Sequence, residues 1–177
     1  MSNGELAVKI RAATVADIEN LASVQLRSAL AGFSHIFPES IAKPIHADLE
    51  EEWAALVADP RTMVAAALVD GAFVGVLAAG PDEDHDKGTD CILLKLYVAP
   101  THFGRGVGSL LYERAIDWFA ASGCKRARLW VLEHNTRALQ MYERRGWVRQ
   151  SWLRSDWPGS GIDEIGYVLD LGDFTRP

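Results

Sequence analysis

The stretch Val98-Ala-Pro-Thr-His-Phe-Gly-Arg-Gly-Val-Gly108 decides the fold of this chain. It follows an apolar segment at 91–98 that predicts a strand, and it precedes 109–122, whose apolar residues recur at helical spacing. Its three alternate glycines leave the backbone bare, so several amides can point into one concavity at the positive end of the helix. Such a concavity suits a phosphate or pyrophosphate, to which Arg105 could add a charge. Without a ligand, the same glycines would serve only a tight turn between strand and helix.

Two common nucleotide-binding loops do not match this stretch. A P-loop requires a lysine directly after its last glycine, and here Ser109 follows Gly108. The dinucleotide fingerprint has the spacing Gly-x-Gly-x-x-Gly, whereas this chain has Gly-x-Gly-x-Gly. The loop therefore predicts an anion site of a different kind.

A second informative segment runs from a predicted strand at 126–132 into a predicted helix at 136–145. Asn135 stands where a helix cap belongs, and Tyr142 follows it after seven residues, which is about two helical turns. Both side chains therefore face the same way. An amide and a phenol on one line can contact two points of an elongated ligand; alternatively, Asn135 only caps the helix and Tyr142 only packs.

Together, the two segments resemble the GNAT superfamily of acetyltransferases. The cofactor loop of that family is Arg/Gln-x-x-Gly-x-Gly/Ala, and this chain has Phe103-Gly-Arg-Gly-Val-Gly108, which matches at the glycines and departs at the first position. The later family motif appears as Asn135, Ala138 and Tyr142-Glu-Arg-Arg-Gly-Trp147. Leu96-Tyr-Val-Ala-Pro100 is similar to the family's fourth strand, and Ile10-Arg-Ala-Ala-Thr14 is similar to its usual start.

The resemblance implies an α+β GNAT acyltransferase fold, with residues 1–177 forming one domain. Its mixed, mostly antiparallel central sheet would be flanked by helices, with a splay between the fourth and fifth strands. Acetyl-CoA would be the co-substrate, and its pantetheine arm would enter the splay beside the backbone of Tyr97 and Val98. The pyrophosphate would be held by the amides of Phe103, Gly104, Arg105, Gly106, Val107, Gly108 and Ser109. Asn135 and Ala138 would line the other wall, and Tyr142 would sit by the thioester sulfur.

The implied reaction transfers an acetyl group to the amine of a small molecule or peptide by direct attack on the thioester. A free alkyl amine has a pKa near ~10.4, so it must lose a proton first. Glu133 is the first choice as proton acceptor because it ends the strand beside the cofactor gap, and His134, Asp90 and Glu164 rank behind it. Tyr142 would protonate the leaving thiolate, although a phenol is a weaker acid than a thiol in water. The alternative function is a coenzyme A-binding sensor or regulatory module without catalysis.

The remaining segments complete an α+β order. Two helices are expected, one starting at Thr14 with Asp17 in its first turn and one at 45–58, with a loop at 32–44 that frames the acceptor in the family. Asp70-Gly71 between two apolar runs predicts a hairpin, and the last two strands, 147–153 and 164–171, are expected around a turn at 158–161. The acidic loop with Asp82, Glu83, Asp84 and Asp86 is expected to be solvated surface, with attraction of a polyamine as the alternative.

Composition limits the remaining function classes. The chain has 177 residues, of which 49% are hydrophobic and 24% charged, which is typical of one globular domain. A net charge of −6 argues against nucleic-acid binding. No apolar run is long enough for a membrane span, and the start lacks the features of a signal peptide, so a cytoplasmic location is expected. Two cysteines and scattered histidines predict no metal site, and association into a homodimer is left open.

Overall fold

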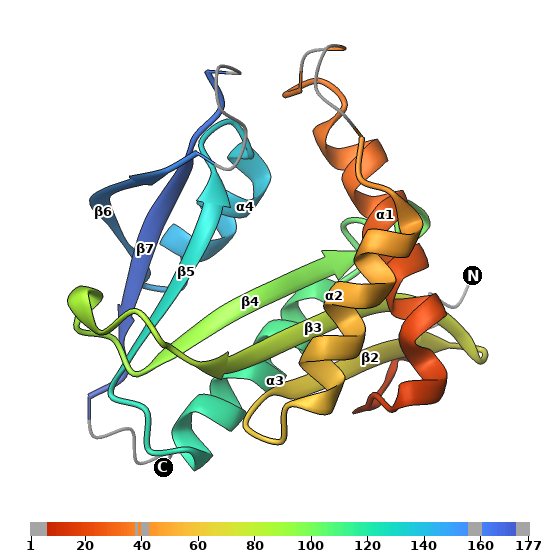
Figure 1. Cartoon of the computed structure of the whole chain (residues 1–177), viewed down its shortest axis with the longest axis horizontal. Coiled ribbons are helices and arrows are strands. Elements are labelled where there is room, and N and C mark those ends of the chain that lie inside the picture. Colours follow the sequence, from red (N-terminus) through yellow and green to blue (C-terminus); the bar gives the residue numbers. More distant parts are fainter. Residues whose placement is uncertain (1–6, 38, 40–42, 156–160, 173–177) are drawn as a thin grey trace, which may run out of the picture.

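The computed structural model of the chain (Figure 1) describes residues 7–37, 39, 43–155 and 161–172. The long elements alternate in the expected α+β order. They are β1 (Lys9–Ala12), α1 (Ile18–Phe33), α2 (His46–Ala58), β2 (Met63–Val69), β3 (Ala72–Pro81), β4 (Cys91–Val98), α3 (Val107–Ala121), β5 (Arg126–Leu132), α4 (Thr136–Glu143), β6 (Val148–Arg154) and β7 (Glu164–Asp170). Short 3-10 turns occupy Val15–Asp17, His85–Lys87 and Pro100–His102.

The strands form one seven-stranded sheet in the order β1-β2-β3-β4-β5-β7-β6. Every neighbouring pair is antiparallel except β4 and β5, which are parallel. The predicted hairpin between β2 and β3 is confirmed: Asp70 and Gly71 have φ values of 50° and 80°, as a tight turn between twisted strands requires.

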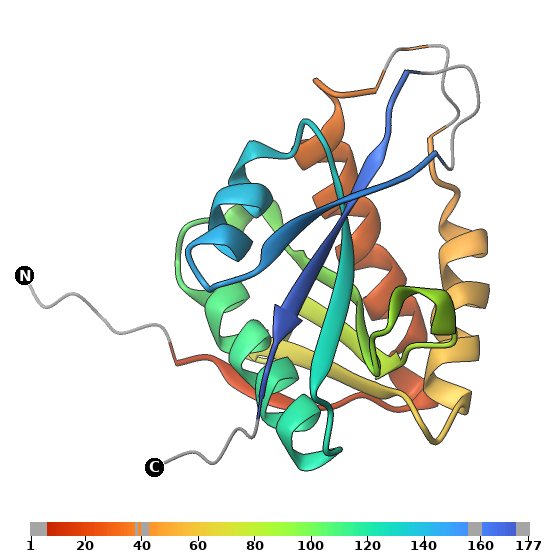
Figure 2. The ribbon, with the colours of Figure 1, turned by 90° about the vertical axis from the view of Figure 1, so that its left-hand side faces the viewer.

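Helices cover both faces of the sheet. Figure 2 shows α3 and α4 on one side and α1 and α2 on the other. The α3 side buries Leu111 and Phe119, and the α1–α2 side buries Leu21 and Trp53, all with no exposed surface. Gly75 on β3 lets α3 approach closely, because a Cβ there would lie 2.7 Å from Cδ1 of Leu111. The protein therefore has two hydrophobic cores, one on each face of the sheet.

The pairing of β4 with β5 is short. It covers only Cys91 to Leu93 on β4 and Ala127 to Leu129 on β5, after which the two strands diverge (Figure 1). On their outer sides, both strands stay paired almost to their ends, β4 with β3 and β5 with β7. The expected splay between the fourth and fifth strands is thus confirmed.

Several helix boundaries differ from the sequence-based expectation. Helix α4 ends at Glu143 instead of residue 145, and a 3-10 turn over Val15–Asp17 precedes α1. Helix α1 continues to Phe33, although a loop was expected from Gly32. Helix α3 begins at Val107, two residues earlier than expected, because Gly106 adopts a φ of 84° and serves as the residue before the helix. The turn predicted at 158–161 lies almost wholly outside the described residues.

The expectation that the acidic loop is solvated surface was wrong for Asp82. Its side chain is 1% exposed and forms an ion pair with Arg128, whose side chain is 6% exposed. Nε of Arg128 donates to Oδ2 of Asp82 at 2.7 Å, and the hydroxyl of Thr89 donates to the same oxygen. A buried carboxylate requires such partners, and the partner on β5 lies 46 residues away along the chain.

Candidate active site

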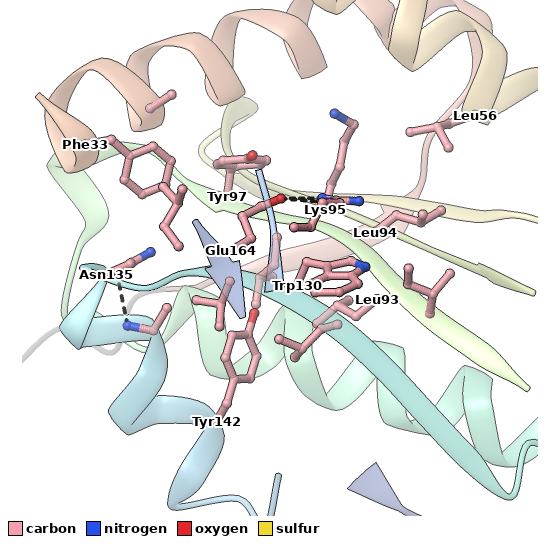
Figure 3. Close-up of a pocket in the computed structure, with 18 residues that line it drawn as sticks. Phe33, Leu56, Leu93, Leu94, Lys95, Tyr97, Trp130, Asn135, Tyr142 and Glu164 are labelled. Carbon is pink, nitrogen blue, oxygen red and sulfur yellow. Dashed lines mark hydrogen bonds and ion pairs between the residues drawn. The ribbon is translucent and has the colours of Figure 1, made fainter. Parts of the chain in front are cut away.

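Two hollows meet where β4 and β5 diverge. The smaller hollow, about 380 Å³, lies between the sheet and helices α1 and α2, and Figure 3 shows the side chains that line it. The larger hollow, about 750 Å³, lies between the glycine loop, α1 and α4. Six residues line both: Phe33, Leu96, Tyr97, Asn135, Ala138 and Tyr142. The hollows therefore share one wall at the splay.

The glycine loop forms one end of the larger hollow. Gly104 and Gly106 have φ values of 73° and 84°, and a Cβ added at either position would meet no atom within 4 Å. Open space thus lies over the bare backbone at the start of the fifteen-residue helix α3. Amides and a helix N-terminus facing open space suit an anionic group such as a pyrophosphate.

The lining of the larger hollow is cationic, although the chain as a whole carries a charge of −6. Among the described residues it contains three arginines and three histidines and no acid: Arg137, Arg144, Arg145, His35, His102 and His134. The guanidinium of Arg137 lies 4.6 Å from the centre of the Phe103 ring, and Nη2 of Arg145 donates to Oγ of Ser109 at 2.7 Å. This lining suits a ligand with several phosphates.

Sequence reasoning missed these three arginines. Arg137, Arg144 and Arg145 stand at positions i, i+7 and i+8 across α4 and its end. That spacing brings all three to one side of the helix axis. The signal was therefore present in the same segment that contains Asn135 and Tyr142.

The structure brings most of the predicted cofactor-binding residues to the larger hollow. Those in its lining are Tyr97, Val98, Phe103, Gly104, Gly106, Gly108, Ser109, Asn135, Ala138 and Tyr142. The other two are absent from it: Arg105 is exposed, and the side chain of Val107 is buried in the core. Oδ1 of Asn135 accepts a hydrogen bond from the amide of Ala138 at 3.3 Å, so Asn135 caps α4.

Two tyrosines stand on the shared wall, one from each side of the splay. Tyr142 on α4 is buried, and its ring meets Trp147 edge-on at 5.8 Å. Burial raises the pKa of the Tyr142 phenol well above its usual value, with a smaller contribution from Tyr97. Burial also raises the pKa of Tyr97 on β4 to about 12, and the nearby charge of Glu164 adds to the effect. Both phenols therefore stay protonated at neutral pH.

The four candidate proton acceptors lie in different places. Glu133 lines neither hollow, and its Oε1 accepts a hydrogen bond from Arg149 at 3.3 Å. The carboxylate of Asp90, just before the start of β4, accepts from the amides of Lys125 and Arg126, next to the paired part of β4 and β5. His134 lines the larger hollow, and Glu164 lines the smaller one. The structure thus brings Glu164, and not Glu133, to the smaller hollow.

Comparison with known proteins identifies the family. The model of the acetyltransferase (GNAT) family matches residues 26–147. An uncharacterized N-acetyltransferase of Mycobacterium bovis is 33% identical over 134 residues, which cover 73% of this chain and 82% of that protein. A Mycobacterium tuberculosis protein with the same description matches equally well. The chain belongs to the GNAT family, and it is an acetyl-CoA-dependent N-acetyltransferase.

Solved structures agree with the fold. An N-acetyltransferase from Thermoplasma acidophilum in complex with coenzyme A aligns with a TM-score of 0.71 at 19% identity, covering 93% of this chain and 99% of that one. A putative acetyltransferase from Salmonella typhimurium with acetyl-CoA gives 0.71 at 18% identity, with 96% and 97% covered. Within the described residues, no group of three or more metal-binding side chains is found. No described helix is long and apolar enough to cross a membrane.

Proposed function

We propose that the protein transfers an acetyl group from acetyl-CoA to the amine of a small molecule or peptide by direct attack on the thioester. The observation that carries this proposal is the wall of six residues common to both hollows. A donor in the larger hollow and an acceptor in the smaller one would meet at that wall, as reaction between two bound substrates requires. Residues 1–177 would act as a single domain.

The larger hollow would hold acetyl-CoA, which supplies the activated acetyl group. The backbone of Tyr97 and Val98 would pair with the pantetheine arm on one side, and Asn135 and Ala138 would contact it on the other. The cationic lining and the open space over Gly104 and Gly106 support a pyrophosphate there. The remaining loop amides in this role are those of Phe103, Arg105, Val107, Gly108 and Ser109.

Tyr142 would lie beside the sulfur. Its raised pKa widens the gap between the phenol and a thiol, so complete proton transfer to the leaving thiolate is unfavourable. A protonated phenol can still donate a hydrogen bond to the sulfur as negative charge develops there. We therefore assign to Tyr142 stabilisation of the leaving thiolate through such a bond.

The test is turnover with the purified full chain. Acetyl-CoA is mixed with a panel of amines and peptides, and the release of free thiol is followed together with the mass of each product. An acetylated amine is the expected result. Binding of coenzyme A by calorimetry without turnover of any amine would instead support the sensor alternative and contradict the proposal.

A further inference from the structure

The walls of the smaller hollow are mostly apolar. Of the described residues that line it, all but four are apolar or aromatic, and the four are Lys95, Asn135, Arg154 and Glu164. Apolar side chains include Leu56 from α2, Leu94 from β4 and Trp130 from β5, which approach the hollow from three elements (Figure 3). Contact between an acceptor and these apolar side chains gains free energy because it excludes water from them.

The charges at the smaller hollow are neutralised in pairs. Nζ of Lys95 donates to Oε2 of Glu52 at 2.6 Å and also lies 5.6 Å from the centre of the Trp53 ring. Arg154 donates to Oε2 of Glu164 from Nε at 2.9 Å and from Nη2 at 2.5 Å. Each of these two pairs joins one cation to one carboxylate.

The carboxylate of Glu164 stands near the shared wall. Glu164 begins β7 and pairs with Leu132 of β5 on one side and Arg154 of β6 on the other. Its charge acts on the phenol of Tyr97, and Figure 3 shows the two side chains directed at the same space. Both bonds from Arg154 end on Oε2 of Glu164, and an ionised carboxylate accepts up to about four hydrogen bonds over its two oxygens.

Stacked side chains hold this end of the hollow. The guanidinium carbons of Arg154 and Arg128 lie 5.0 Å and 5.4 Å from the centre of the Trp130 ring. Arg128 in turn is fixed by the buried carboxylate of Asp82. A row of contacts thus runs from the core through Trp130 to Arg154 and Glu164. It orients the Glu164 carboxylate before any acceptor arrives, which reduces the cost of binding.

We propose that the smaller hollow binds a primary amine on an uncharged, apolar body, and that Glu164 holds the ammonium and takes its proton. This inference rests on the proposed acetyl transfer. Glu164 accepts one proton from the ammonium, and the neutral nitrogen then bonds to the acetyl carbonyl carbon as the carbon–sulfur bond breaks. The nitrogen then loses a second proton, and the leaving thiolate takes up one proton to become a thiol. Glu164 returns its proton to solvent, so one proton is released per turnover.

The first experiment compares acceptors with the unmodified full chain. The probes are 2-phenylethylamine and hexylamine as apolar monoamines, spermidine as a polyamine, and a lysine-containing hydrophilic peptide. We expect kcat/KM for the apolar monoamines to exceed the other values by at least about tenfold, because a few buried methylenes each contribute about 0.8 kcal/mol. Turnover confined to spermidine or the peptide overturns the inference and leaves acetyl transfer intact. No turnover with any amine overturns both.

The second experiment compares Glu164→Gln with Glu113→Gln, which removes an exposed carboxylate on α3 outside both hollows. At neutral pH, kcat/KM of the Glu164 variant should fall by ~10²–10⁴, the usual scale for a general base. Its activity should then rise about tenfold per pH unit toward the pKa of the amine, because only amine that is already neutral can react. The affinity for coenzyme A by calorimetry should be unchanged in both variants.

Two results would overturn the role of Glu164. One is full activity of Glu164→Gln with an unchanged pH profile. The other is loss of activity in Glu133→Gln while Glu164→Gln keeps its rate, since Glu133 would then be the residue that accepts the proton. Both variants are nearly isosteric with the native residue, and the calorimetric affinity for coenzyme A reports whether each is folded.

Discussion

Tyr142 illustrates how surroundings change the chemistry of one side chain. The ring is buried against Trp147, and burial disfavours the charged phenolate. A phenol with a raised pKa is a poorer acid, but it remains a hydrogen-bond donor across the neutral pH range. Its contribution to catalysis should therefore have the size of one hydrogen bond to a charged group rather than that of a complete proton transfer.

This argument gives a prediction for Tyr142→Phe. The variant should lower kcat by about 10- to 100-fold, because a hydrogen bond to a charged group contributes about 1.5–3 kcal/mol. KM for acetyl-CoA should change little, since the bond strengthens only as the sulfur becomes negative. Steady-state kinetics with single-turnover controls for chemistry measures both quantities.

Tyr167→Phe is the matched control for that variant. Tyr167 is also buried, its hydroxyl donates to Oε1 of Glu143 at 2.8 Å, and it lines neither hollow. The Tyr167→Phe variant should lose about 1.5–3 kcal/mol of stability, because its lost hydrogen bond is to a carboxylate, and it should keep its turnover. If Tyr142→Phe behaves in the same way while chemistry is rate-limiting, Tyr142 is a packing residue.

Single residues also show where sequence reasoning is limited. Asn135 was predictable as a helix cap because the interaction is local, between residues three apart. Asp82 and Glu164 were not, because their cationic partners stand on other strands and only the pairing of the sheet brings them together. The charge of a residue is visible in the sequence, whereas its burial and its distant partner are not.

At the scale of elements, the turn from the glycine loop into α3 links backbone conformation to ligand binding. Gly106 has a positive φ and leaves open space where a side chain would project. Gly71 in the β2–β3 hairpin has almost the same geometry, with a φ of 80° and no atom within 4 Å of an added Cβ. Gly106 lines the larger hollow at the start of α3, whereas Gly71 lies in a hairpin that lines neither hollow.

The pair gives a controlled prediction. Gly106→Glu and Gly71→Glu should each lose about 1 kcal/mol of stability from the strained backbone. Only Gly106→Glu should also weaken coenzyme A binding, by at least tenfold, because it places bulk and negative charge where the pyrophosphate is proposed. Calorimetry on both folded variants measures the difference. Equal affinities would contradict the assignment of the loop.

Helix α4 and the two residues that follow it supply the arginines of the larger hollow. Arg137 is exposed and lies over Phe103, so its guanidinium is held in place at the mouth. Arg137→Gln should raise the dissociation constant of coenzyme A by about tenfold, which corresponds to one charged hydrogen bond. The binding of pantetheine, which lacks the nucleotide phosphates, should not change. An equal loss for both ligands would place Arg137 elsewhere in the site.

The elements were largely predictable from periodicity. The strand–turn–strand pattern around Asp70-Gly71 and the helical spacing after the glycine loop both correspond to observed elements. The error at α1 came from treating Gly32 as a breaker, although Leu26, Ala29, Leu30 and Phe33 continue the helical spacing. The splay came from the family resemblance, since no periodicity shows where paired strands diverge.

At the scale of the whole molecule, the buried pair of Asp82 and Arg128 connects the part of the sheet that ends with β4 to the part that begins with β5. Asp82 directly follows β3, and Arg128 is part of β5. Burial alone would raise the pKa of Asp82, but the hydrogen bonds from Arg128 and Thr89 outweigh it and hold the pKa below its usual value. A carboxyl with a depressed pKa stabilises the fold fully above about 3.9, and this contribution is lost as the pH falls through the folded-state pKa.

We expect Asp82→Asn to lose up to about 3–5 kcal/mol at pH 7, because the buried Arg128 charge keeps only the more distant Asp84, whose Oδ2 lies 4.0 Å from Nη1. The loss should shrink in acid, where the native carboxyl becomes protonated. Asp59→Asn, which breaks an exposed pair with Arg61, should lose less than about 1 kcal/mol. Urea unfolding of both variants at pH 7 and pH 3 measures these values, and equal losses at the two pH values would contradict the pKa assignment.

The three-residue seam between β4 and β5 leaves two strand edges facing each other inside the molecule. Edges attract other extended chains, and proteins usually protect them. Here we expect the co-substrate to cover the two edges. The backbone amides at 94–98 that do not bond to β3 should exchange hydrogen faster than those at 65–68 on β2, which is paired on both sides, and bound coenzyme A should slow only the former.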